Sequence, residues 1–174
     1  CLIDEWIRKN SKKKFDIEGL IARSGQTDDL ILNQAIENFS VDSYDTKSLD
    51  IKDFDIFFAK GLSLENGAST LTDFTAKLIA DGINYSNSKS QSDNSKWLVC
   101  GGGRKNKYLL ESIKNNFGKI NISSIDQYGI NGDFIESQAF AFLAIRSLEK
   151  MPISFPSTTR CKHSSTGGVI VNNF

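Results

Sequence analysis

The sequence predicts an α/β fold built around a parallel sheet. Trp97 to Cys100 is a short continuous apolar run, which is typical of a buried strand, and Gly101 to Gly103 follow it directly. Apolar residues at helical spacing run from about Asn106 to Phe117, and a further short strand is indicated by Ile120, Ile122 and Ile125. A strand, a glycine turn, a helix and a strand make a βαβ unit, whose strands lie parallel.

The first half of the chain is predicted to be mainly helical. A first helix is indicated by Leu2, Ile3, Trp6 and Ile7, which recur at helical spacing. A second is expected at residues 30–39, and a third from about Asn66 to Gly82, with Gly82 as its C-cap. The connecting segments lack a clear period and are expected to be loops; they cover residues 15–25, 40–55 and 84–96.

The end of the chain is expected to add one long helix and one strand. The helix covers about Phe134 to Lys150 and is apolar nearly all round from Phe134 to Ile145, which predicts that it is buried. Residues 167–171 are expected to form a closing strand. A length of 174 residues suits one large domain or two small ones.

Composition and charge exclude several classes of protein. The 21 basic and 21 acidic side chains give zero net charge, which argues against a general nucleic-acid binder. No apolar run approaches the roughly 18 residues of a membrane helix, so we expect no membrane partner. The three cysteines form no CxxC pair, and a reducing cytoplasm suits them best. Cys161 and His163 are too few ligands for a metal, so we assign no metal-binding residue.

The chain opens at Cys1 in the middle of an amphipathic stretch, which is typical of a fragment. The alternative is a processed lipoprotein whose N-terminal cysteine carries the lipid. Such a protein would be expected to place a tether-like spacer before its fold, so we favour the fragment.

The triple glycine, Gly101 to Gly103, is the first candidate functional site. Glycines between a strand and a helix let the backbone approach a ligand closely and turn N–H groups towards it. The structural alternative is a tight turn that needs positive φ. Three consecutive glycines exceed what a turn needs, so we favour contact with a nucleotide, although the pattern is neither GxGxxG nor a Walker loop.

Glu136 is the second candidate, because it lies in the first turn of the apolar helix. A buried carboxylate is costly unless it is paired, which marks Glu136 as a site candidate. Asp133 and Glu136 also have capping-box spacing, with Asp133 as N-cap. The residues alone support both interpretations equally. A third candidate, the small and hydroxyl residues of segment 63–75, is more typical of a helix start capped by Ser63.

Taken together, these segments closely resemble the anhydro-N-acetylmuramic acid kinase family of bacterial cell-wall recycling enzymes. The resemblance runs nearly from end to end. It is carried, in order, by LIDEW (residues 2–6), FD (15–16) through SG (24–25), KSLD (47–50), GLS (61–63), residues 67–75, CGGGRKN (100–106), GDFIESQAF (132–140), residues 152–159 and TGG (166–168). The segment 160–163 departs from the family, where a more apolar, proline-containing stretch is usual.

The resemblance implies a ribonuclease-H-like domain of the sugar-kinase, actin and heat-shock-chaperone superfamily, with a small mixed sheet flanked by helices. Residues 1–174 would be the C-terminal domain of a two-domain kinase that holds ATP and Mg²⁺ between its domains. The family hydrolyses the 1,6-anhydro bond of its sugar while phosphorylating O6, which gives N-acetylmuramic acid 6-phosphate in peptidoglycan recycling. Its phosphate loop and general-base aspartate would lie in the missing N-terminal domain, so we expect this chain alone to be inactive.

The resemblance also assigns roles to residues of this chain. Gly101, Gly102 and Gly103 would pass under the adenosine of ATP, with Asn106 as a polar contact, and Glu136 would position the sugar or the attacking water. Two alternatives stay open: a stand-alone nucleotide-binding module, and a non-catalytic interaction protein of the same fold. A homodimer is also left open.

Overall fold

The computed structural model describes residues 2–39, 51–90, 96–118 and 121–171. The chain divides into two compact units, which are described separately below. Unit 1 covers Cys1–Ser124 and unit 2 covers Ile125–Phe174. None of the helices in these described ranges is long and apolar enough to cross a membrane.

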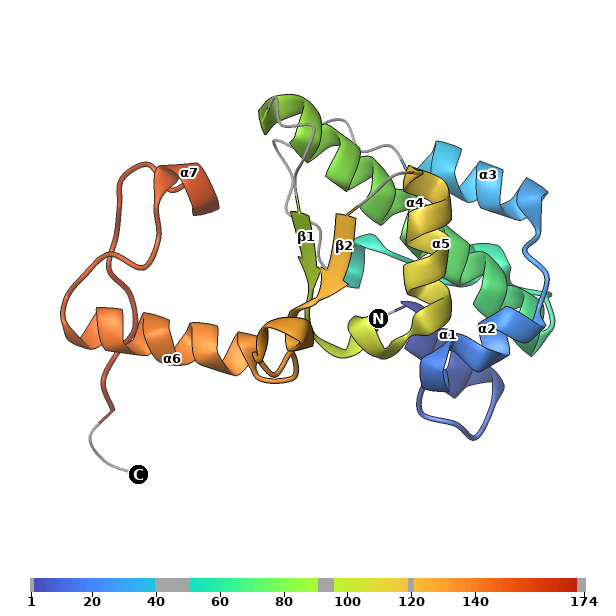
Figure 1. Ribbon diagram of the computed structural model, residues 1–174, viewed down its shortest axis with the longest axis horizontal. Coiled ribbons are helices and arrows are strands. Elements are labelled where there is room, and N and C mark those ends of the chain that lie inside the picture. The colour runs from blue at the N-terminus through green and yellow to red at the C-terminus, as the bar shows by residue number, and fades with distance from the viewer. Residues whose placement is uncertain (1, 40–50, 91–95, 119–120, 172–174) are drawn as a thin grey trace. The chain divides into compact units, whose positions relative to one another are not determined.

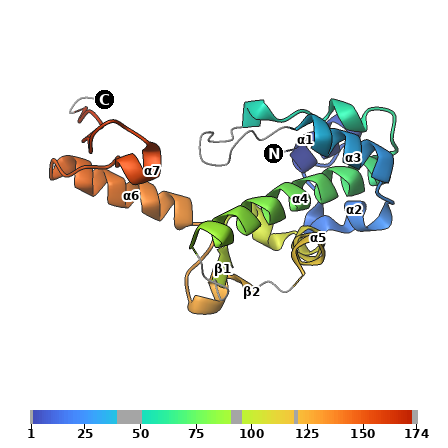
Figure 2. The ribbon, with the colours of Figure 1, turned by 90° about the horizontal axis from the view of Figure 1, so that it is seen from above.

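A central helix, α4 (Leu64–Ser90), organises unit 1. It packs against α1 (Leu2–Asn10), α2 (Leu20–Ser24), α3 (Asp29–Asn38) and α5 (Lys107–Phe117), as the two ribbon views show (Figures 1 and 2). The predicted helices at 2–7, 30–39 and 106–117 are confirmed, with small shifts of their ends.

The helix α4 is longer than predicted, because it continues through Gly82 to Ser90. Gly82 as its C-cap was therefore wrong, and so was the expected loop over residues 84–90; residues 91–95 lie outside the described residues. A single glycine weakens a helix by only about 1 kcal/mol, and a polar sequence is compatible with an exposed helix. Composition cannot distinguish such a helix end from a loop.

The core of unit 1 forms where α1 and α4 meet. Phe74 and Leu71 of α4 and Ile7 of α1 are almost completely buried. The indole Nε1 of Trp6 donates a hydrogen bond to the carbonyl oxygen of Leu64 at 2.9 Å. Gly67 gives the Trp6 ring its space, since a Cβ there would lie 2.2 Å from Cζ2 of the ring. The two helices thus approach closely at a glycine.

The predicted βαβ unit is confirmed, but the expectation that its first strand is buried was wrong, because Leu98 is 47% exposed. Strand β1 (Lys96–Val99) pairs in parallel with β2 (Asn121–Ser124), with Trp97 opposite Ile122, and α5 is the crossover between them. The described residues thus hold a parallel pair of strands rather than the mixed sheet that the resemblance implies.

The expected loop at residues 15–25 contains helical turns instead: the 3₁₀ turn Ile17–Gly19 and α2. Local capping explains this error, because the buried carboxylate of Asp16 accepts hydrogen bonds from the backbone N–H groups of Ile21 and Ala22. A helix of five residues is too short to show a hydrophobic period. The expected loop at 40–55 lies mostly outside the described residues; the 3₁₀ turn η2 (Ile51–Asp53) falls within its end, and η3 (Phe57–Ala59) lies just beyond it.

Unit 2 contains α6 (Ile135–Leu148) and the short α7 (Pro156–Thr159). The residues after α6 fold back on it, because Ser147 Oγ donates a hydrogen bond to the carbonyl oxygen of Gly167. Within this segment, Ser154 and Ser165 form an antiparallel bridge. The expected strand at 167–171 was wrong, because these residues form no ladder.

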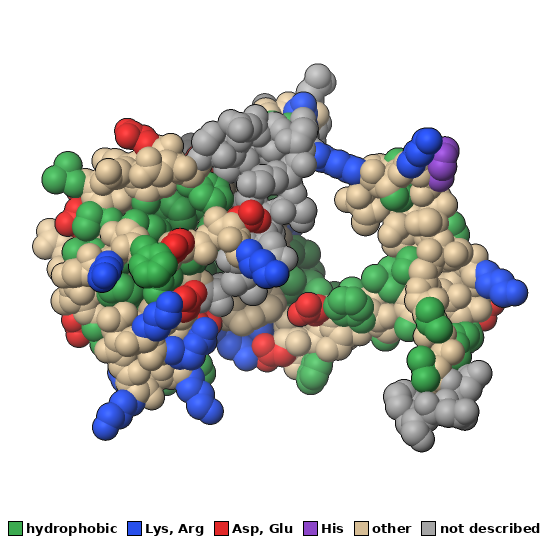
Figure 3. Space-filling model, turned by 180° about the vertical axis from the view of Figure 1, so that it is seen from behind, with side chains coloured by type: hydrophobic (Ala, Val, Ile, Leu, Met, Phe, Trp, Pro, Cys, Tyr) green, Lys and Arg blue, Asp and Glu red, His purple; other side chains and the backbone are tan. Residues whose placement is uncertain are grey.

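The expectation that α6 is buried was also wrong. Its large apolar side chains are mostly exposed, including Phe140 (65%), Phe142 (59%) and Ile145 (60%), and hydrophobic side chains are visible on the surface of unit 2 (Figure 3). An all-round apolar helix predicts burial, but burial also requires neighbours on every side. The described part of unit 2, with α6, the 3₁₀ turn η5 (Ile125–Tyr128) and the short helix α7, does not supply them.

Candidate functional site

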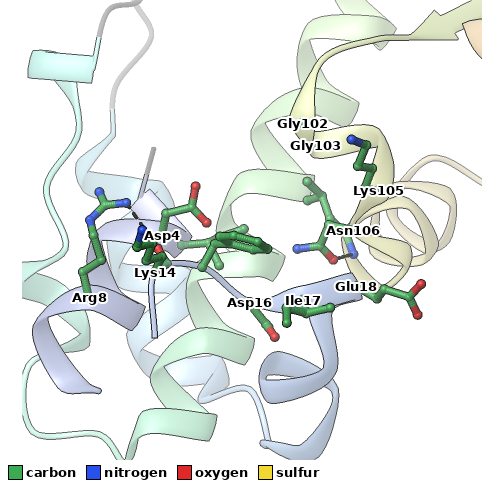
Figure 4. A pocket seen from close by; sticks show the side chains of 13 residues that line it. Asp4, Arg8, Lys14, Asp16, Ile17, Glu18, Gly102, Gly103, Lys105 and Asn106 are labelled. Carbon is green, nitrogen blue, oxygen red and sulfur yellow. Dashed lines mark hydrogen bonds between the residues drawn. The ribbon is translucent and has the colours of Figure 1, made fainter. Parts of the chain in front are cut away.

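A cavity of about 810 Å³ in unit 1 lies between the start of the chain and the glycine turn (Figure 4). Its walls come from α1, from the segment that precedes α2, and from the segment that connects β1 to α5. The lining residues are Ile3, Asp4, Arg8, Lys14, Phe15, Asp16, Ile17, Glu18, Gly102, Gly103, Lys105, Asn106 and Leu109. Three of the five predicted site residues, Gly102, Gly103 and Asn106, therefore meet at one cavity.

The three glycines are not equivalent in the structure. Gly101 has a φ of +70°, which a residue with a side chain rarely adopts, so the turn itself requires glycine there. Gly102 and Gly103 belong to the 3₁₀ turn η4 (Gly102–Lys105) and have no positive φ. A Cβ added at Gly102 would meet no atom within 4 Å. The folded chain thus explains Gly101 and leaves Gly102 and Gly103 without a structural reason.

The Arg104 side chain folds back onto this turn. Its Nη1 donates a hydrogen bond to the carbonyl oxygen of Gly101 at 2.9 Å. The backbone N–H of Asn106 donates to the carbonyl oxygen of Gly103 at 3.1 Å. The backbone between β1 and α5 is therefore held at both of its ends.

Asn106 is the N-cap of α5. Its Oδ1 accepts a hydrogen bond from the backbone N–H of Leu109 at 2.9 Å. The cap fixes the orientation of the amide, because only oxygen can accept this bond. The Nδ2 group is consequently turned into the cavity, as Figure 4 shows, and it donates to none of the described residues.

The three carboxylates of the cavity have different partners. Asp16 caps α2, and Glu18 forms an ion pair with Lys107 at 2.8 Å. Asp4 forms no hydrogen bond or ion pair with any described residue. Three cations, Arg8, Lys14 and Lys105, also line the cavity, which gives it a mixed electrostatic character suited to a ligand with both polar and anionic parts.

A second, smaller cavity of about 250 Å³ lies beside Asp73. The carboxylate of Asp73 accepts hydrogen bonds from the hydroxyls of Thr27 and Ser112. Ser69 connects this group to Tyr108, whose hydroxyl lies 3.2 Å from Ser69 Oγ. These contacts tie α4, α5 and the segment before α3 together, so they serve the fold.

The hydroxyl-rich segment 63–75 is structural, as favoured from the sequence. Ser63 Oγ accepts a hydrogen bond from the N–H of Asn66 at 3.1 Å, which places it at the start of α4. Thr70 and Thr72 donate to carbonyl oxygens one turn earlier in the same helix. Most of these hydroxyl groups therefore form hydrogen bonds within unit 1.

Glu136 lies in the first turn of α6 in unit 2, where it is exposed. The capping-box interpretation is wrong, because Phe134 is the N-cap of α6 and no side chain caps it. The catalytic interpretation of Glu136 stays a prediction. Cys161 and His163 lie in a loop, as expected.

Sequence reasoning missed the wall of the cavity that α1 and residues 14–18 provide. Asp4, Arg8 and Glu18 are far from the glycine turn along the chain, and no spacing rule connects them to it. The glycines in segment 15–25 did indicate a loop, but nothing in the sequence connected that loop to the glycine turn.

Comparison with known proteins identifies close relatives. A family model described as anhydro-N-acetylmuramic acid kinase matches residues 1–173. The anhydro-N-acetylmuramic acid kinase of Pelagibacter ubique is 51% identical over 176 residues, which cover 100% of this chain and 47% of that protein. The proteins of the same name from Rhodospirillum rubrum and Rhizorhabdus wittichii are 35% and 38% identical, over 44% and 45% of their lengths. The chain thus spans about half the length of the curated relatives it matches.

Proposed function

This chain belongs to the anhydro-N-acetylmuramic acid kinase family, and from that membership we propose that it is the C-terminal part of an ATP-dependent sugar kinase. The whole enzyme converts 1,6-anhydro-N-acetylmuramic acid to N-acetylmuramic acid 6-phosphate and opens the anhydro ring with water. The reaction belongs to peptidoglycan recycling and takes place in the cytoplasm. The domain is proposed to have a ribonuclease-H-like fold, of which the βαβ unit is one part.

The observation that supports ATP binding is the glycine turn beside the cavity. Gly102 and Gly103 line the cavity, and neither backbone conformation nor crowding requires glycine at these positions. Close approach of a ligand to the backbone supplies the missing reason. We assign these two residues to contact with the adenosine of ATP, Gly101 to shaping the turn, and the Nδ2 of Asn106 to a polar contact with the nucleotide.

The cavity residues are compatible with Mg²⁺ that arrives with ATP. Asp16 and Glu18 are already engaged, which leaves Asp4 as a carboxylate without a partner among the described residues. Mg²⁺ in kinases is commonly held by one or two carboxylates together with phosphate oxygens and waters. When bound, the ion would neutralise phosphate charge.

Glu136 is proposed to hold a sugar hydroxyl or to orient the attacking water. Its carboxylate is exposed and takes no part in capping α6, so it is available to a substrate. The general base that activates the water would belong to the N-terminal part of the enzyme. This chain alone is therefore expected to show no turnover of the anhydro sugar.

The decisive experiment on the nucleotide site replaces Gly102 with Val in the full-length enzyme. The new side chain has free space in the fold, so the melting temperature should hold, whereas the KM for ATP should rise about tenfold through loss of nucleotide contact. Gly129→Ala is the control, because Gly129 has a positive φ but lies outside the cavity, so alanine there should lower the melting temperature and leave the KM unchanged. An unchanged KM in Gly102→Val would refute the assignment of this cavity to ATP.

A second experiment tests Glu136. Glu136→Gln keeps size and polarity but removes the charge, and we expect kcat/KM to fall at least about tenfold, or about 1.4 kcal/mol of transition-state stabilisation. The melting curve should be unchanged, because Glu136 is exposed and caps nothing. Full activity of this variant would contradict the proposed role.

A further inference from the structure

Gly19 is in close contact with the N-terminus of α5, although it precedes Asn106 by 87 positions in the sequence. Its backbone is left-handed, with φ +77°. A Cβ at Gly19 would lie 2.2 Å from Asn106 Oδ1 and 2.7 Å from Tyr108 Cβ. Neither atom can move away easily, because Oδ1 caps α5 and Cβ is fixed to the backbone.

The segment that carries Gly19 is held firmly in place. Asp16 is buried and accepts hydrogen bonds from Ile21 and Ala22, which fixes the start of α2. Glu18 is also left-handed, at φ +56°, a conformation that is unfavourable for a residue with a side chain. The ion pair between Glu18 and Lys107 joins this strained position to the first residue of α5.

The first turn of α5 is held from the other side as well. The hydroxyl of Tyr108 lies 3.2 Å from Ser69 Oγ on α4, and the guanidinium of Arg23 lies 5.4 Å from the centre of the Tyr108 ring. Arg23 also pairs with Glu111 one turn further along α5. The start of α5 therefore sits between α4 and the segment 16–24, with almost no free space at Gly19.

We propose that Gly19 is a positioning residue for the nucleotide site: the absence of a side chain lets Asn106 keep the rotamer in which Oδ1 caps α5 and Nδ2 faces the cavity. This inference rests on the proposed binding of ATP in that cavity. A side chain at Gly19 would displace the Asn106 amide and so weaken nucleotide binding, without touching the nucleotide.

The test compares Gly19→Ala with Gly129→Ala in the full-length enzyme. Gly129 has nearly the same φ, +74°, but a Cβ there meets no atom within 4 Å, so it is a control for the backbone cost of alanine. We expect Gly19→Ala to raise the KM for ATP about tenfold with kcat nearly unchanged. Gly129→Ala should lower the melting temperature but leave the KM as it is.

A double-mutant cycle tests whether the effect passes through Asn106. In the Asn106→Ala background there is no amide to displace, so Gly19→Ala should raise the KM for ATP no further. Asn106→Ser retains a capping oxygen and loses the amide; it should raise the KM while the melting temperature falls little.

A milder variant covers the case in which Gly19→Ala does not fold. Lys107→Met removes the ion pair with Glu18 from outside the cavity and leaves Gly19 intact, and it should raise the KM for ATP about two- to threefold. The inference is overturned if Gly19→Ala and Lys107→Met bind ATP like the wild type, or if Gly19→Ala acts equally in the Asn106→Ala background. Failure of the ATP proposal itself is recognised separately, because Gly102→Val would then also leave the KM unchanged.

Discussion

The two units of the chain differ in what holds them together. In unit 1 four helices pack against α4, and side chains such as Phe74 and Ile7 are fully buried. In unit 2 no apolar side chain of the described residues is buried, and the fold is maintained by local hydrogen bonds around α6. Arg146 is typical of these, since its Nε donates to the carbonyl oxygen of Pro152 at 2.7 Å.

This difference shows that an apolar sequence does not by itself place a helix in the hydrophobic core. The helix α6 has a more apolar sequence than α4, yet α4 forms the core, because other elements cover it on several sides. Apolar area contributes to stability only when it is removed from water. Unit 1 should accordingly be stable by itself, and unit 2 should depend on its surroundings.

Two phenylalanines give the largest expected contrast. Phe74→Ala should destabilise the chain by about 3–5 kcal/mol, because Phe74 is 2% exposed and packs against Phe39 and Phe58. Phe140→Ala should cost less than about 1 kcal/mol, since that ring is 65% exposed. Urea unfolding of both variants measures the difference, and equal losses of unfolding free energy would contradict the proposed contrast between the two units. If Phe140→Ala destabilises only the full-length enzyme, the rest of the protein covers α6.

Hydrogen exchange should separate the two central helices. Amides in the buried part of α4, around Leu71 and Phe74, should exchange only through global unfolding. Amides of α6 should exchange at least about 100-fold faster, through local opening of unit 2. Mass spectrometry of peptic fragments resolves the two helices. Equal protection of both would mean that the units unfold as one.

Two serines provide the smallest and most local test. Ser112 Oγ donates to Asp73 in unit 1, and Ser147 Oγ donates to the carbonyl oxygen of Gly167 in unit 2. Each Ser→Ala change should cost about 1 kcal/mol. The loss at Ser112 should lower the midpoint of global unfolding, whereas the loss at Ser147 should speed exchange in α6 alone. An effect of Ser147→Ala on α4 would contradict the independence of the units.

The amino-acid pattern alone predicted α1, α3, α5 and the start of α4 in unit 1, the parallel βαβ unit and the position of the glycine turn, but it missed α2 and the end of α4. These features follow from local patterns: apolar residues at helical spacing, a short apolar run, and glycine at the strand end. Asn106 as the start of a helix follows in the same way, because a capping residue acts on backbone groups two or three positions away.

Packing between distant segments determines which residues share a site and which apolar surface is covered. Gly19 and Asn106 meet through the packing of the segment 16–24 against α5, and no periodicity records that contact. The apolar pattern of α6 likewise predicts burial, but it does not show whether another element covers the helix. Local patterns arise from interactions within one or two turns of chain, whereas cavities and cores depend on how complete elements pack, which is why the sequence predicted the glycine turn and missed its opposite wall.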